Sequence, residues 1–160
     1  MKIKGLVDED FVNFKLPCMF ISIGTCNWKC CIETNIPVTV CQNSDLAKQK
    51  DIDIPIDEIF NRYISNPISE AIVIGGLEPM MQFEDVYDLI KYFRDKKVND
   101  VFVIYTGYCP NEIQDKIENL KAFKNIICKF GRYVPNQEKH FDDVLGVNLV
   151  SDNQYGEVIS

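Results

Sequence analysis

The sequence contains a single histidine, His140, and this scarcity narrows the chemistry open to it. Zinc sites built from several histidines, and catalytic triads with a histidine base, have almost no material here. No apolar run approaches the ~20 residues that a membrane-spanning helix needs, so no membrane segment is expected. Basic residues are outnumbered 17 to 24 by acidic ones, giving a formal charge of −7. That balance argues against a general nucleic-acid binder, because phosphate contacts need a basic face.

A secretory signal is not expected either. Asp8, Glu9 and Asp10 stand where such a signal would need an apolar stretch. We therefore expect a cytoplasmic protein, in which seven cysteines suggest metal or redox chemistry before a disulfide framework. The Cys-x-x-Cys pair of many thiol-redox proteins does not occur.

Apolar runs and segments of helical period alternate along the 160 residues, which suits one compact domain over 1–160. Short β-branched runs predict buried strands at 18–23, 71–74, 101–105, 125–130 and, more weakly, 144–150. Apolar stripes predict three amphipathic helices, at 55–64, 83–94 and 110–120. This alternation predicts an α/β fold with a parallel sheet and right-handed crossovers.

Three cysteines stand within six residues just after the first predicted strand: Cys26, Cys30 and Cys31. Cys41 follows in the same long loop. Dense thiolates make poor packing material, but they are good ligands for soft metals and iron–sulfur clusters. We interpret Cys26 and Cys30 as two ligands of a [4Fe–4S] cluster, with a third from Cys41 or Cys31. Four thiolates could instead close a zinc site, although structural zinc usually draws two cysteine pairs from separate turns.

Two glycine-containing turns follow the next predicted strands: Gly75-Gly76-Leu77-Glu78-Pro79 and Tyr105-Thr106-Gly107-Tyr108. Ligand sites in α/β folds lie beyond the carboxyl ends of the strands. The cysteine loop and both turns are therefore expected to meet at one edge, with a small polar ligand beside the metal.

The spacing Cys26-x3-Cys30, followed by Gly75-Gly76-x-Glu78-Pro79, resembles the radical S-adenosylmethionine superfamily, and most closely the activating proteins of anaerobic ribonucleotide reductase. Three later segments agree in order and spacing: 103–108, 129–133 and 151–154. The resemblance implies an anaerobic enzyme with a [4Fe–4S] cluster whose open iron binds S-adenosylmethionine. An electron from a donor such as flavodoxin or ferredoxin would cleave that cofactor to a 5′-deoxyadenosyl radical. The radical would remove a hydrogen atom from a glycine of a glycyl radical enzyme, with no catalytic side chain beyond the cluster.

The sequence departs from the usual Cys-x3-Cys-x2-Cys pattern of that superfamily, because Glu33 occupies the third position. The missing ligand must then be Cys41 or Cys31. We prefer Cys41, since adjacent cysteines rarely aim both sulfurs at one cluster. A second departure is Leu77, inserted between the glycines and Glu78. Both changes indicate a divergent subfamily.

The resemblance also implies a set of residues around the bound cofactor: Gly75, Gly76, Glu78, Thr106, Gly107, Lys129 and Arg132. Glu78 is expected to accept from the ligand's ammonium group, or else to be a helix-entry carboxylate. Lys129 or Arg132 is expected to pair with its carboxylate, unless both are solvated surface charges. At this length the barrel would be partial and open, with a mostly parallel sheet of about five or six strands, since a complete barrel needs about 250 residues.

Two other functions stay open. The first is a radical enzyme of the same superfamily that acts on a small molecule or peptide. The second is a zinc- or cluster-stabilised binding protein without catalysis. An open barrel side favours a macromolecular partner, which ranks activation of another enzyme first.

Overall fold

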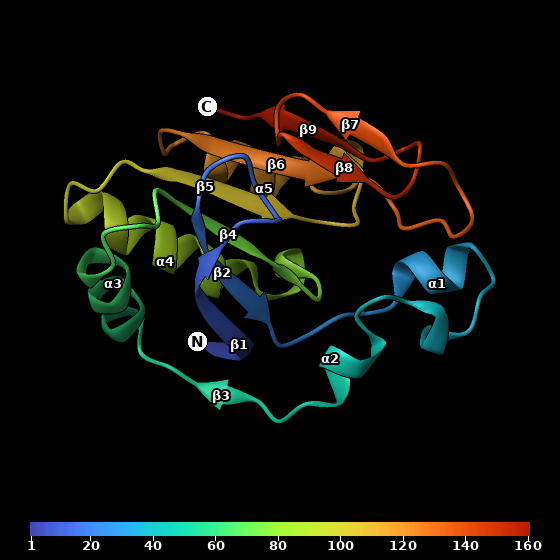
Figure 1. Cartoon of the computed structure of the whole chain (residues 1–160), viewed down its shortest axis with the longest axis horizontal. Helices are drawn as coiled ribbons and strands as arrows, with labels where there is room; N and C mark the ends of the chain where they lie inside the picture. The colour runs from blue at the N-terminus through green and yellow to red at the C-terminus, as the bar shows by residue number, and fades with distance from the viewer.

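A seven-stranded sheet forms the centre of the computed structural model, which describes residues 1–160 (Figure 1). The strands stand in the order β3-β1-β2-β4-β5-β6-β9, and a separate hairpin pairs β7 with β8. The strand bounds are β1 Lys2–Asp10, β2 Cys18–Ile23, β3 Ile52–Asp53, β4 Ala71–Gly76, β5 Val101–Tyr105, β6 Ile126–Phe130, β7 His140–Asp142, β8 Val147–Leu149 and β9 Tyr155–Val158.

The four central strands, β2, β4, β5 and β6, run parallel, whereas β1, β3 and β9 pair antiparallel at the two sides. The predicted α/β fold is confirmed, with its parallel centre. The expected number of strands was wrong, because the sheet has seven. Its free edges are β3 and β9, so the sheet is open; the finer prediction of a partial barrel is not confirmed.

The three predicted helices are present, the third of them split by a turn. They are α3 (Ile56–Ser65), α4 (Phe83–Asp95) and the pair η3 (Pro110–Glu112) and α5 (Gln114–Leu120). Acidic residues in the first turns of α3 and α4 and an arginine in each last turn match the helix dipole. No helix has both the length and the apolar character to span a membrane.

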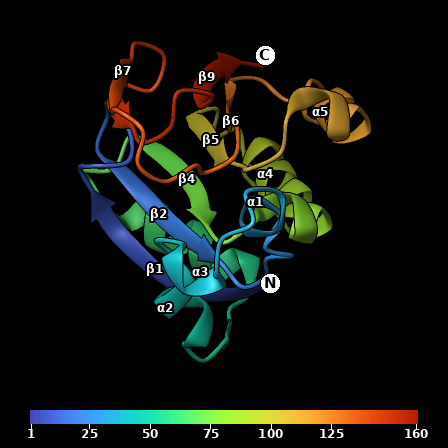
Figure 2. The same cartoon turned by 90° about the vertical axis from the view of Figure 1, so that its right-hand side faces the viewer.

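The two faces of the sheet carry different cores. Ile72 and Ile74 of β4 point into a cluster of 23 buried residues that includes α3, α4 and α5. Val73, on the opposite face, belongs to a cluster of only eight, which the 147–149 strand and Phe14 help to cover. Figure 2 shows α4 and α5 on one side of the sheet and β7 on the other. The thinly covered face leaves room for a cavity.

Four short helices lie in the loops: α1 (Lys29–Glu33), η1 (Val38–Val40), α2 (Ser44–Lys48) and η2 (Pro79–Gln82). Figure 1 shows α1 and α2 beyond the carboxyl ends of the parallel strands. The register pairs Ile23 with Gly76 and Tyr105 with Lys129, so neighbouring strands end together. The cysteine loop and both glycine turns therefore meet at this end of the sheet.

Candidate metal centre

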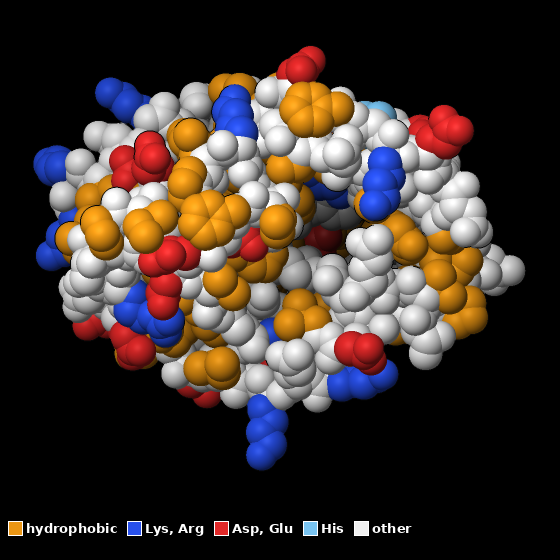
Figure 3. Space-filling view, in the orientation of Figure 1, with side chains coloured by type: hydrophobic (Ala, Val, Ile, Leu, Met, Phe, Trp, Pro, Cys, Tyr) orange, Lys and Arg blue, Asp and Glu red, His pale blue; other side chains and the backbone are white.

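All four cysteines of the long loop line one cavity of about 550 Å³ at the carboxyl ends of the parallel strands. Cys26 lies in the turn after β2, Cys30 and Cys31 are on α1, and Cys41 directly follows η1. Figure 3 shows the hollow in this face of the molecule, with acidic and basic atoms inside it. The four cysteines, which lie near one another in the sequence, thus also border the same space in the structure.

The thiols are partly shielded from water and lie close enough to influence one another. Burial raises the pKa of Cys26 to about 11, and the neighbouring Glu78, Cys30 and Cys41 add to that effect. Burial also raises the pKa of Cys31, as do Cys41 and Cys30. A bound metal would have to displace these protons and would compensate the thiolate charge.

No three His, Cys, Asp or Glu side chains converge closely enough in the structure to hold a single ion. A [4Fe–4S] cluster makes a different demand, because each of its thiolates binds a separate iron. The donor chemistry here is four thiols around one cavity, which suits iron–sulfur ligation. The residues present therefore fit such a cluster.

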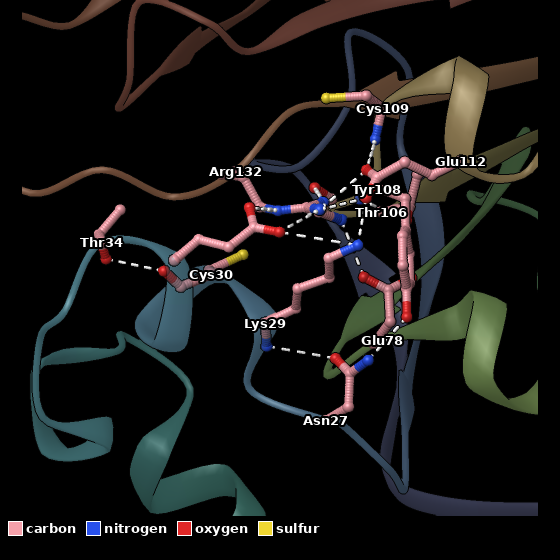
Figure 4. A network of polar contacts seen from close by, with 12 residues as sticks. Asn27, Lys29, Cys30, Thr34, Glu78, Thr106, Tyr108, Cys109, Glu112 and Arg132 are labelled. Carbon is pink, nitrogen blue, oxygen red and sulfur yellow. Dashed lines mark hydrogen bonds and ion pairs between the residues drawn. The ribbon is translucent and has the colours of Figure 1, made fainter.

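Glu78 is buried in the first glycine turn, and its carboxylate joins this turn to the second (Figure 4). Its Oε1 accepts from Thr106 Oγ1 at 2.7 Å and from Met80 N at 3.0 Å, and its Oε2 accepts from Gly107 N at 2.8 Å. Burial raises the pKa of this carboxyl, and the three donors oppose that shift. Glu78 also caps η2, as the helix-entry alternative expected. Most of its hydrogen-bonding capacity is therefore used within the protein.

The two glycines at the end of β4 have different surroundings. Gly76 lines the cavity with φ at +79°, and a Cβ there would lie 2.9 Å from Leu46 Cδ2. Its carbonyl accepts from Asn43 Nδ2. Gly75 instead packs below Tyr105, whose Cβ would stand 3.2 Å from an added methyl. Only Gly76 borders the space that a ligand would fill.

Lys129 and Arg132 are both buried, so their interpretation as solvated surface charges was wrong. Lys129 lines the cavity, and its Nζ donates to Gly131 O at 3.2 Å. Burial lowers the pKa of Lys129 to about 8, while nearby Cys30 and Glu78 act in the opposite direction. This ammonium group is the cation that faces the cavity.

Arg132 does not line the cavity. Its guanidinium donates to Glu33 Oε2 at 2.7 Å, to Glu112 Oε1 at 2.7 Å and to the carbonyl of Gly107. Because its donors face these groups, pairing of Arg132 with a ligand carboxylate is not what the geometry favours. Of the two predicted cations, only Lys129 lines the cavity.

Several cavity-lining residues were not predicted from the sequence; examples are Asn43, just before α2, and Leu46, within it. A helix as short as α2 shows no periodic pattern, so the sequence did not predict that these side chains would line the cavity. Gln154 also lines the cavity and belongs to the 151–154 segment, which carried only weak weight. Its Oε1 accepts from the backbone N–H of Val150, another lining residue, at 3.2 Å.

Two comparisons with known proteins bear on this site. Residues 17–152 match the family described as 4Fe-4S single cluster domain. A protein of Methanocaldococcus jannaschii, named as a glycyl-radical enzyme activating enzyme, is 27% identical over 135 residues. That alignment covers 82% of this chain and 52% of the relative, so the chain spans about half the length of that protein. The family match extends over most of the sequence and includes all four loop cysteines. The chain therefore belongs to the 4Fe-4S single cluster domain family.

Proposed function

We propose that this protein is a radical S-adenosylmethionine enzyme that activates a glycyl radical enzyme. The observation that carries the proposal is one cavity lined by four thiols together with Gly76, Glu78, Thr106, Gly107 and Lys129. The 4Fe-4S family supports the cluster, and the activating-enzyme name of the M. jannaschii relative supports the reaction class. Anaerobic ribonucleotide reductase is the first partner to test.

Cys26, Cys30 and Cys41 would hold the cluster, with Cys31 as the alternative third ligand. When bound and reduced, by a donor such as flavodoxin or ferredoxin, the cluster supplies the electron that splits S-adenosylmethionine into methionine and a 5′-deoxyadenosyl radical. The protein contributes ligation, orientation and shielding from water. Cys41 reaches the cavity from η1, whereas Cys31 shares α1 with Cys30.

Lys129 would pair with the carboxylate of the methionine moiety. Its buried Nζ makes one long hydrogen bond, to Gly131 O at 3.2 Å, and an ammonium group has two further donors to offer. A charged group at this depth gains from an anionic partner, since burial alone disfavours its charge. Lys129 would therefore orient the cofactor in the cavity.

Glu78, Thr106 and Gly107 would shape the floor of the cofactor site. The Glu78 carboxylate fixes the Thr106-Gly107 turn through two hydrogen bonds, at 2.7 and 2.8 Å. It keeps one acceptor position beyond its three protein donors, so a contact with the ligand's ammonium group is secondary to holding the turn. Gly76, without a side chain, leaves space at the end of β4.

The test is anaerobic reconstitution with iron and sulfide, followed by iron quantitation and assay of 5′-deoxyadenosine under a strong reductant. We expect about four irons per chain and cofactor cleavage. Cys26→Ala and Cys30→Ala should lose both. Cys41→Ala should lose the intact cluster, and Cys31→Ala should keep it. Cys109→Ala is the matched control, because Cys109 is half-buried but does not line the cavity.

Absence of iron uptake, or a cluster without cleavage, would contradict the proposal. One zinc per chain with no affinity for S-adenosylmethionine would favour a binding protein instead. Glycyl-radical formation on anaerobic ribonucleotide reductase, followed by electron paramagnetic resonance, tests the partner. A competent enzyme that leaves that partner unchanged would point to another target, such as a small molecule or peptide.

A further inference from the structure

Four charged side chains around α1 form a closed ring of alternating sign. Figure 4 labels three of them, Lys29, Glu112 and Arg132. Lys29 lies 3.6 Å from Glu33, Glu33 is 2.7 Å from Arg132, and Arg132 is 2.7 Å from Glu112. An ion pair between Glu112 and Lys29 closes the ring. None of the four lines the cavity, so the ring lies outside the site described above.

The helix that carries Cys30 and Cys31 is too short to be stable by itself. α1 has five residues, and isolated helices shorter than about 12–15 residues are marginal in water. Trp28 precedes it at φ 58° and provides no side-chain cap, and the first turn contains no acidic residue. Cys31 is the only buried residue of the helix. The position of α1 therefore depends on contacts made from elsewhere in the chain.

Arg132 supplies the central contact. Its side chain is only 9% exposed and joins Glu33 on α1, Glu112 on η3 and the carbonyl of Gly107. Gly107 lies close to Cys30, since a Cβ on it would be 2.8 Å from Cys30 Sγ. The guanidinium thus fixes both the helix that bears this sulfur and the turn against which the sulfur rests.

Tyr108 reinforces the same connection. The centroid of its aromatic ring lies 5.2 Å from Lys29 Nζ and 5.3 Å from Arg132 Cζ, the two cations of the ion-pair ring. Its hydroxyl accepts from Asn27 Nδ2 at 2.7 Å, just before α1 begins. The 27–33 segment is therefore attached to residues 107–112 at both ends. Asn27 bonds to Tyr108 at its start, and Glu33 is linked through Arg132 to Glu112 at its end.

We propose that this ion-pair ring positions Cys30 for cluster binding, with Arg132 as its central positioning residue. The inference rests on the proposed function and deepens it. Glu33 stands where the radical S-adenosylmethionine pattern has its third cysteine, and here it holds α1 through Arg132 instead of through a metal–thiolate bond. Glu33 is already paired with Arg132, and the third cluster ligand would be Cys41 or Cys31.

The first measurement uses metal-free protein and follows alkylation of each cysteine by mass spectrometry. In Arg132→Met we expect Cys30 to react about five- to tenfold faster, because easier local opening of α1 outweighs the slower reaction of a thiol that has lost a cationic neighbour. Cys128, buried in β6, reports global unfolding and should keep its wild-type rate. Arg132→Lys should rescue part of the effect, since an ammonium group keeps the charge but lacks the planar fork.

The second measurement is iron content and the electron paramagnetic resonance spectrum after reconstitution. Arg132→Met should retain less than half of the wild-type iron, and Arg132→Lys should be intermediate. The matched control is Arg62→Met. Arg62 forms a similar fork with Asp8, at 3.0 and 2.7 Å, away from the cysteine loop. It should match the wild type in iron content and in Cys30 alkylation.

Unchanged Cys30 alkylation in Arg132→Met would overturn the inference, even if the wild type binds iron and cleaves its cofactor. Failure of the wild type to take up iron would instead contradict the proposed function, and the alkylation result would still report on the ring. If Cys128 also reacts faster in Arg132→Met, Glu33→Gln decides. That change keeps the shape of the side chain and removes its charge, so Cys30 alone must then become more reactive.

Discussion

The central strands and the cysteine loop are stabilised in different ways. The first five residues of β4 are buried, and Ile72 and Ile74 belong to the larger apolar cluster. In the loop, η1 and α2 have no buried residue and α1 has one. Its attachments are polar, such as the ion pair of Glu33 with Arg132. The sheet is therefore built by apolar burial, whereas the loop depends on polar contacts and, under our proposal, on its metal.

Phe93→Ala tests the apolar core beneath the sheet and should have the largest effect on stability. Phe93 is fully buried and packs against Phe60, Tyr63 and Phe102, with ring centroids 5.0 to 5.5 Å apart. Truncation should lower the free energy of unfolding by about 3–5 kcal/mol, from lost burial and a cavity. Urea denaturation measures it. Below the transition, Cys30 alkylation should stay at the wild-type rate; a rise would mean that core and loop are not separable.

Gly76→Ala tests the junction between the two regions. At φ +79°, and with a would-be Cβ 2.9 Å from Leu46 Cδ2, alanine is strained there and the Leu46 side chain must move. We expect a loss of about 1–3 kcal/mol in unfolding free energy, together with weaker cofactor binding. Gly5→Ala is the control, since nothing lies within 4 Å of its added methyl. Equal effects of the two changes would contradict this explanation.

Lys129→Met tests whether the cavity itself binds the cofactor through its cation. The change removes the ammonium group that lines the cavity and keeps a side chain of similar length. Affinity for S-adenosylmethionine should fall about tenfold, equivalent to ~1.4 kcal/mol, while iron content stays at the wild-type level. Equilibrium binding to the reconstituted protein measures this. Unchanged affinity would remove Lys129 from the cofactor site.

Glu112→Gln should have the smallest effect. Partial burial alone would raise the pKa of Glu112, but the Cys109 N–H, Lys29 and Arg132 lower it from 4.5 to about 2. Because the folded state favours the ionised form, this stabilisation is present above about pH 4.5 and is lost as the pH falls toward 2. The wild type should exceed the variant by less than about 1 kcal/mol at neutral pH. Thermal unfolding should show the difference vanishing in acid; a gap that persists at pH 2 would assign it to another cause.

The sequence was most informative where burial is uniform. β2 and β5 begin and end where their apolar runs do, and α3 and α4 agree to within about a residue with their apolar stripes. β1 was missed because its sequence, KIKGLVDED, mixes charged and apolar residues along the side of the sheet. α1 and α2 were missed because five residues are too few to display a helical stripe.

The sequence predicted which residues meet at the candidate site better than it predicted where their side chains point. Cysteine spacing and the ends of parallel strands sufficed to group the sulfurs with Gly76 and Lys129. They could not show that Arg132, three residues after Lys129, faces away from the cavity. Gly131 stands between them at φ +101°, and this turn of the backbone separates the two cations. Side-chain direction across such a turn depends on tertiary neighbours.

Gly131 has a further consequence, for the far edge of the sheet. A methyl group on it would lie 2.3 Å from the carbonyl oxygen of Asn153, just ahead of β9. Alanine would therefore force the backbone ahead of β9 to move, and any loss of the β6–β9 pairing would leave β6 with unpaired peptide groups. Bare strands of that kind pair readily with other molecules. Glycine at position 131 thus lets β9 begin close beside β6 and cover its peptide groups.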